Sequence, residues 1–180
     1  MNPYIALLRA VNLGGSTQLS MAALREGLRR RGYNRVETLQ QSGNIVLRSA
    51  VTHPGRLERQ LETDVATELG FNAEFFVRTA AEWRTSLISN PFPQEAERDP
   101  AHLVLTLLKD EPSPAQWKAL AEGFPGRERV EPSGRQAYIV YPDGIGRSKL
   151  TTALIERKLG TRCTSRNWNT VKKLDRLASA

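Results

Sequence analysis

The order of apolar runs and turn residues in the first 79 positions constrains the fold more than any other feature of this chain. Their spacing predicts a strand, a helix, two strands, a helix and a strand, at residues 4–11, 21–31, 36–40, 44–48, 54–69 and 73–78. This β-α-β-β-α-β order is the split βαβ unit of ferredoxin-like folds. We therefore predict an α+β fold in which strands form antiparallel or mixed sheets with the helices on one face.

Residues 80–180 partly repeat this order. A short helix is predicted at 80–89, and a breaker and an acidic loop follow it. The later segments predict a strand, a helix, a hairpin and two helices, at 102–108, 114–123, 127–131 with 135–141, 150–159 and 169–177. Because no long flexible linker separates the two parts, we predict one compact domain of residues 1–180, built from two ferredoxin-like halves at 1–79 and 80–180.

Charge is concentrated at the C-terminal end of the sequence. Residues 147–180 carry nine Lys and Arg against two acids, which accounts for the whole net charge of +7. Such a basic segment predicts either a local site for an anion or a surface for nucleic acid. A solvated helix surface is the alternative.

Several function classes are excluded or not supported. The single cysteine, Cys163, permits neither an intramolecular disulfide nor a thiolate metal cluster. No apolar stretch approaches the roughly 20 residues that span a bilayer, and no signal peptide is recognisable, so we expect a cytoplasmic protein with no membrane partner. His53 and His102 have no ligand partner at metal spacing. We therefore predict no metal site and no cofactor.

The loop at 143–150 is the strongest candidate for an anion site. Gly146 would let backbone N–H groups turn toward a ligand, Arg147 and Lys149 would add positive charge, and Ser148 could donate a hydrogen bond. The glycine-to-lysine spacing is not that of a Walker A loop. The alternative is a tight turn in which Ser148 caps the next helix. Asp143 is the only nearby carboxylate in sequence and is expected to be a turn residue.

Three further segments contribute candidate ligand-binding residues. Arg166, Asn167 and Trp168 precede a predicted helix and could bind a phosphate and stack on a base, or Asn169 could cap that helix while Trp168 packs on the core. The other candidates lie at strand ends, where Asn and Gly more often satisfy turns: Arg9, Asn12, Gly14 and Gly15 after the first strand, and Ser42 and Asn44 in the central hairpin.

Four of these segments together resemble a known family. They are Tyr4 to Gly15, Gln41 to Asn44, Tyr141 to Leu150, and Gly160 to Trp168. In order and along nearly the whole chain, they resemble the bacterial family named domain of unknown function sixteen ninety-seven. The resemblance implies a cytoplasmic, ferredoxin-like α+β protein with an internal duplication. It implies no activity and no catalytic residues.

The sequence leaves three functions open. The first is binding of a phosphate-bearing partner, either a nucleotide-like small molecule or a nucleic acid. The second is an enzyme acting on an anionic small molecule, with Lys149 or Arg147 stabilising negative charge. The third is an interaction module for an acidic protein. Crowding of the candidate cations and Asn residues into one pocket would favour a small ligand, and their dispersal along one face would favour nucleic acid. The oligomeric state is not determined by sequence.

Overall fold

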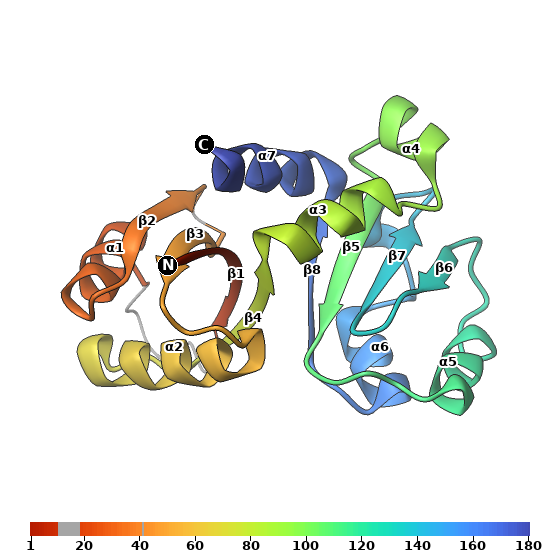
Figure 1. Cartoon of the computed structure of the whole chain (residues 1–180). Coiled ribbons are helices and arrows are strands. Elements are labelled where there is room, and N and C mark those ends of the chain that lie inside the picture. Colours follow the sequence, from red (N-terminus) through yellow and green to blue (C-terminus); the bar gives the residue numbers. More distant parts are fainter. Residues whose placement is uncertain (11–18, 41) are drawn as a thin grey trace. The chain divides into compact units, whose positions relative to one another are not determined.

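The computed structural model describes residues 1–10, 19–40 and 42–180, which fold into two compact units (Figure 1). The first unit comprises Met1–Ser86 and Lys173–Ala180, and the second comprises Leu87–Lys172. The C-terminal residues therefore pack with the first unit, where Arg84 Nε donates a hydrogen bond to Asp175 Oδ1 at 2.8 Å. This assignment differs from the boundaries of the halves at 1–79 and 80–180. That residues 1–180 form one compact domain stays a prediction.

The first unit has the predicted βαββαβ order. Its strands are β1 (Asn2–Ala10), β2 (Asn34–Leu39), β3 (Asn44–Ser49) and β4 (Ala73–Thr79), and its helices are α1 (Met21–Arg30) and α2 (Pro54–Leu69). The four strands pair in the order β2-β3-β1-β4, and each described pair is antiparallel. This arrangement confirms the ferredoxin-like prediction for residues 1–79.

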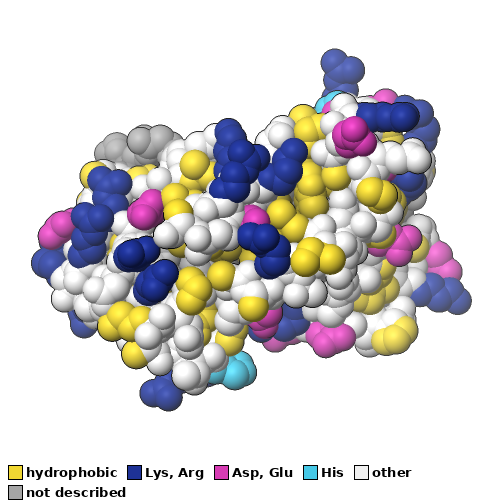
Figure 2. Space-filling view, turned by 45° about the horizontal axis from the view of Figure 1, so that its top comes forward, with side chains coloured by type: hydrophobic (Ala, Val, Ile, Leu, Met, Phe, Trp, Pro, Cys, Tyr) yellow, Lys and Arg dark blue, Asp and Glu magenta, His cyan; other side chains and the backbone are white. Residues whose placement is uncertain are grey.

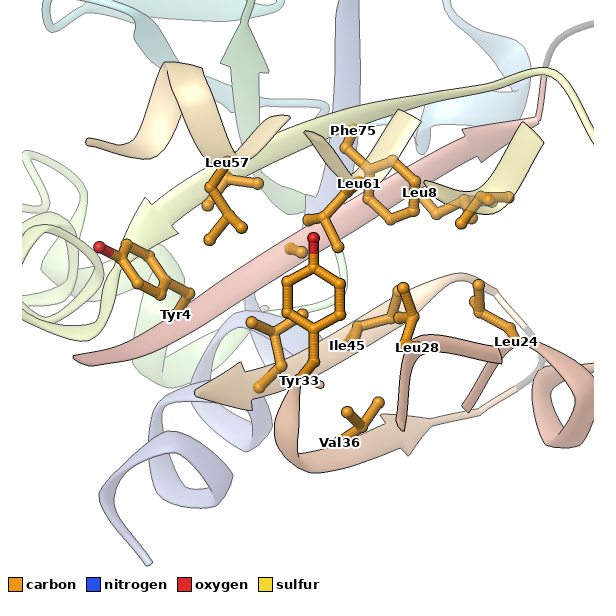
Figure 3. Packing of buried hydrophobic residues seen from close by; sticks show 14 of the residues in the cluster. Tyr4, Leu8, Leu24, Leu28, Tyr33, Val36, Ile45, Leu57, Leu61 and Phe75 are labelled. Carbon is orange, nitrogen blue, oxygen red and sulfur yellow. The ribbon is translucent and has the colours of Figure 1, made fainter. Parts of the chain in front are cut away.

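Local signals in the sequence explain both helices of this unit. The Ser20 side chain caps α1 by accepting a hydrogen bond from the Ala23 N–H, and Gly70 ends α2 in the left-handed conformation with φ of 66°. The apolar stripe of α2 is buried on the sheet, where Leu61 lies beside the aromatic ring of Phe75 and Leu57 lies toward Tyr4 (Figure 3). Both helices thus cover one face of the sheet.

The second unit repeats this topology. Its strands are β5 (Leu103–Leu108), β6 (Arg129–Pro132), β7 (Gln136–Val140) and β8 (Cys163–Asn167), which pair antiparallel in the order β6-β7-β5-β8. Helices α5 (Pro114–Ala121) and α6 (Thr152–Leu159) cover one face of the sheet, and a 3-10 turn, η1 (Ile145–Arg147), precedes α6. The prediction of two ferredoxin-like halves in an α+β fold is confirmed.

Three further helices accompany the two sheets. They are α3 (Ala80–Ile88), α4 (Pro93–Arg98) and α7 (Trp168–Ser179). The sequence predicted an acidic loop in place of α4, but Pro93 is at the first helical turn, a position where proline loses no helix hydrogen bond. Helix α7 begins in the second unit and ends in the first.

Strand β8 was not predicted from the sequence. Its residues, Cys-Thr-Ser-Arg-Asn, carry no apolar alternation, and they form a strand because β5 supplies the pairing, from Val104 with Asn167 to Leu108 with Cys163. The alternation of side chains along a strand places Cys163 on the helix-covered face with Val104 and Leu108. Arg166 and Thr164 consequently project from the opposite face.

Candidate functional site

The loop between β7 and α6 holds its shape through backbone and hydroxyl hydrogen bonds. Gly144 has φ of 84°, and η1 follows it directly. The Leu150 N–H donates to Ser148 Oγ at 2.9 Å, and Thr151 caps α6 by accepting from the Leu154 N–H at 3.2 Å. Thr151 therefore caps the helix, whereas the alternative interpretation of the sequence had predicted Ser148 as the cap. Gly146, Arg147 and Lys149 are exposed on this loop.

Two cations from this region line a common hollow. Lys149 comes from the loop, and Arg157 comes from the exposed side of α6. The hollow has a volume of about 450 Å³, and Phe124, Pro125 and Leu154 form an apolar part of its wall. Among the residues that the structure describes, neither cation forms an ion pair. We refer to this space as the Lys149 hollow.

The structure brings Glu128 to the same loop, a contact that the sequence did not predict. The Ser148 hydroxyl donates a hydrogen bond to Glu128 Oε1, although the two residues are 20 positions apart. No local pattern marks Glu128, because the contact depends on the path of the chain from α5 into β6.

Glu128 also lines a second hollow, of about 470 Å³, between α5 and β6. Its wall includes Trp117, Phe124, Gly126 and Val130, and Phe124 belongs to the walls of both hollows. We call this space the Glu128 hollow. The loop that follows α5 thus borders two hollows, one lined by Lys149 and Arg157 and one lined by Glu128 and Lys118.

Tyr141 is buried next to the loop between β7 and α6. Its hydroxyl donates to the Leu150 carbonyl oxygen at 3.2 Å. Burial raises the pKa of the Tyr141 phenol above its usual value, and the nearby Cys163 and Glu128 raise that pKa further. Tyr141 is therefore a neutral hydrogen-bond donor that holds the loop to the core.

Arg166, Asn167 and Trp168 lie away from Lys149. Arg166 projects from the sheet face opposite α5 and α6, where its Nη1 donates to Thr164 Oγ1 at 2.9 Å, and burial lowers its pKa to about 10. Asn167 caps α7 by accepting from the Thr170 N–H at 3.0 Å, so it takes the capping role expected of Asn169. Trp168 is buried with its ring centroid 6.2 Å from that of Tyr138.

Two candidate residues of the first unit, Ser42 and Asn44, belong to its hairpin. Asn44 is fully buried, and its Nδ2 donates to the Leu39 carbonyl at 3.2 Å and to Ser42 Oγ at 2.8 Å. Both bonds fit the turn interpretation. Arg9 lies on β1 opposite Glu74 of β4. Asn12, Gly14 and Gly15 lie outside the described residues.

Comparison with known proteins places the chain in a family. Residues 1–138 match the model of a family described as protein of unknown function (DUF1697). The chain belongs to this DUF1697 family. The match confirms the resemblance found in the sequence, and it assigns no activity.

A solved structure supports the DUF1697 fold over the full length. The conserved bacterial protein SP0830 from Streptococcus pneumoniae is 22% identical, with a TM-score of 0.75 over 98% of this chain and 98% of that chain. At this identity the similarity shows the fold alone. No curated protein matches the chain.

Within residues 1–10, 19–40 and 42–180 of this DUF1697 protein, no group of three or more His, Cys, Asp or Glu side chains could hold a metal ion. His102 Nδ1 lies 2.8 Å from Asp99 Oδ2, three residues earlier in the same turn. Over the same ranges, the helices are too short or too polar to cross a bilayer.

Proposed function

We propose that this DUF1697 protein binds a small phosphate-bearing ligand in the Lys149 hollow. The observation that carries the proposal is that Lys149 and Arg157 line one space of about 450 Å³ and form no ion pair with another described residue. Two cations without acidic partners favour a multiply charged anion. The volume lies within the range of about 300–1,000 Å³ that is typical of small-molecule sites.

The apolar wall supports a ligand with an organic part. Phe124, Pro125 and Leu154 offer surface against which a base or another flat group could pack. A free phosphate ion would leave this surface in contact with water. A nucleotide-like molecule uses both the cations and the apolar wall, and it therefore fits the hollow better than inorganic phosphate.

The distribution of charge favours a small ligand over an extended nucleic acid. Figure 2 shows Lys and Arg side chains at several places on the face that it presents, with Asp and Glu side chains among them. Arg166 is on the sheet face opposite the helices that border the Lys149 hollow. Within the second unit, the basic side chains of residues 147–166 thus do not follow one strip of surface.

A thermal-shift panel tests the proposal. It contains nucleotides, sugar phosphates, inorganic phosphate and short oligonucleotides, each at low and moderate salt. A ligand that binds only the native state raises the melting temperature according to its concentration relative to Kd. We expect a shift from a phosphate-bearing organic molecule that persists at moderate salt. A shift from oligonucleotides only, lost as salt rises, would instead indicate a surface that binds nucleic acid.

Matched variants assign the binding to the hollow. Lys149→Ala and Arg157→Ala should each weaken binding of the ligand found by roughly tenfold or more, because each removes one charge-assisted contact. Arg98→Ala is the control, since it removes an equally exposed cation of the same unit outside the hollow. Equal losses in all three variants would mean that only net charge matters. Arg147→Ala then shows whether the site extends into the loop.

The Ser148–Glu128 hydrogen bond favours a second candidate function, an enzyme acting on an anionic substrate. A hydroxyl that donates to a carboxylate has the arrangement of a nucleophile with its base, and Lys149 follows it directly. Hydrolysis of activated phosphate and carboxylate esters by the protein, abolished in Ser148→Ala and retained in Ser165→Ala, would support this candidate.

A further inference from the structure

We propose that the Glu128 hollow binds an organic ammonium ion. This site differs from the proposed phosphate site in its charged group, a carboxylate, although Phe124 borders both hollows. Its wall is formed by α5, β6 and the segment between them. The volume of about 470 Å³ is large enough for a small organic molecule. Three features of its wall lead to this class of ligand.

The first feature is the state of the Glu128 carboxylate. Its Oε1 accepts from the Ser148 hydroxyl, whereas its Oε2 is buried and accepts no hydrogen bond from the part of the chain that the structure describes. A Cβ at position 126 would collide with Oε2, so Gly126 is required for this placement. A carboxylate oxygen removed from water is stabilised by a positively charged donor. An ammonium group in the hollow supplies that charge without having to contact Oε2, which lies against Gly126.

The second feature is the aromatic content of the wall. Trp117 and Phe124 both line the hollow, each half-buried and packed against the core of the unit. The faces of aromatic rings attract cations, most strongly for Trp, and sites for quaternary ammonium groups combine such rings. A carboxylate beside two aromatic rings therefore selects an organic cation over a neutral apolar molecule.

The third feature distinguishes an organic cation from a metal ion. Ca²⁺ and Mg²⁺ need several oxygen ligands, and Glu128 is the one carboxylate in this wall. The remaining wall is largely apolar, with Leu120, Val130 and Pro132. Lys118 also borders the hollow, but its Nζ lies 3.9 Å from Glu122 Oε1, so an acidic partner accompanies its charge.

Choline and its neutral carbon isostere, in which carbon replaces nitrogen, provide the direct test. Titration of each into the full chain, followed by NMR of the Trp117 indole and by calorimetry, compares two ligands of equal shape. We expect saturable binding of choline that is roughly tenfold or more tighter than that of the isostere. Equal binding of the two would overturn the proposal, because the hollow would then recognise apolar shape only.

Variants identify the group that recognises the cation. Glu128→Gln should weaken choline binding by roughly tenfold or more while keeping an oxygen that can accept from Ser148. Glu131→Gln is the matched control, because it makes the same charge change at an exposed position three residues along the chain, in β6 and outside the hollow. Unchanged binding in Glu128→Gln would refute the assignment. If that variant does not fold, Phe124→Leu is the second test. It keeps an apolar side chain but removes an aromatic ring, so it must weaken the binding of choline more than the binding of the isostere.

Two additional measurements separate this site from others. Lys149→Ala must leave choline binding unchanged. A failure of the proposed phosphate site can then be distinguished from a failure of the proposed ammonium site. A short peptide with one trimethyllysine, compared with free choline, shows whether the cation comes from a protein side chain or a small molecule. Failure of choline, the peptide and simple primary amines to bind would rule out an ammonium site.

Discussion

The two units share one topology but cover their sheets with helices of different length. The first unit uses α1 of 10 residues and α2 of 16 residues. The second unit uses α5 and α6, each of 8 residues, and hollows of about 470 and 450 Å³ lie beside them. The two hollows considered as candidate sites therefore lie beside short helices.

Both units nevertheless protect an edge strand in the same way. In the first unit, the Phe75 and Val77 N–H groups of β4 donate to Glu62 and Glu58 of α2 at 3.0 and 2.9 Å. In the second, the Cys163 N–H of β8 donates to Glu156 of α6 at 2.9 Å. Carboxylates on the helix thus bind the outward N–H groups that would otherwise be available to another strand. The longer helix makes two such contacts, and the shorter helix makes one.

The largest expected effect is at Glu58. Its side chain is buried, accepts the Val77 N–H and lies 3.8 Å from the Arg78 guanidinium. Glu58→Ala should destabilise the protein by about 3–5 kcal/mol, because it removes one partner of a buried ion pair. Urea unfolding measures this change. Arg59→Ala, an exposed neighbour on the same helix, should stay within about 0.5 kcal/mol.

The equivalent contact in the second unit should be weaker. The Glu156 side chain is 14% exposed, against 6% for Glu58, and its Oε2 also accepts from exposed Arg162 at 3.1 Å. Glu156→Ala should therefore cost about 1–3 kcal/mol, the value for an unsatisfied buried donor. If Glu58→Ala and Glu156→Ala gave equal losses of unfolding free energy, the difference in burial between the two carboxylates would not matter for stability.

The hairpin turns of the two units allow a direct comparison, with an expected loss of unfolding free energy of intermediate size. Gly43 and Gly134 occupy the β2–β3 and β6–β7 turns with φ of 70° and 59°, so alanine is strained at both. An added Cβ at Gly43 would lie 2.8 Å from the Leu8 carbonyl oxygen, whereas one at Gly134 would meet nothing within 4 Å. Gly134→Ala should cost about 1–2 kcal/mol, and Gly43→Ala should cost clearly more. Thermal and urea unfolding of both variants measure the two costs. Equal losses of unfolding free energy would mean that backbone strain explains both, with no contribution from a collision at Gly43.

The smallest expected effect is a pH dependence in the second unit. The hydrogen bond from Arg129 lowers the pKa of Glu95 below 4.5, so this contact contributes stability above the ordinary pKa and loses it as pH falls through the lowered pKa. Because Arg129 is more than half exposed, the change should be about 1 kcal/mol or less. Urea unfolding from neutral pH to about pH 3 should show a smaller acid loss in Arg129→Ala than in the unmodified chain. An identical acid loss would mean that this pair contributes nothing.

Sequence determined the repeated topology because the responsible signals are local. Ser20 and Ser113 cap their helices, Gly70 ends α2 in the left-handed conformation, and the apolar stripe from Leu57 to Val65 faces the sheet. Each signal acts within one turn of a helix or one hairpin, so it can be predicted without knowing the distant parts of the chain.

Tertiary structure decided β8 and the candidate sites. Cys163–Asn167 is polar and becomes a strand only because β5 lies beside it, and the Ser148–Glu128 contact joins residues 20 positions apart. Alternation along β8 then sends Arg166 to the face opposite the helices, away from Lys149, although both belong to one basic segment of the sequence. Sequence specified Lys149 as a residue that could bind an anion, whereas the fold placed Arg157, which was not among the predicted residues, beside it in one hollow.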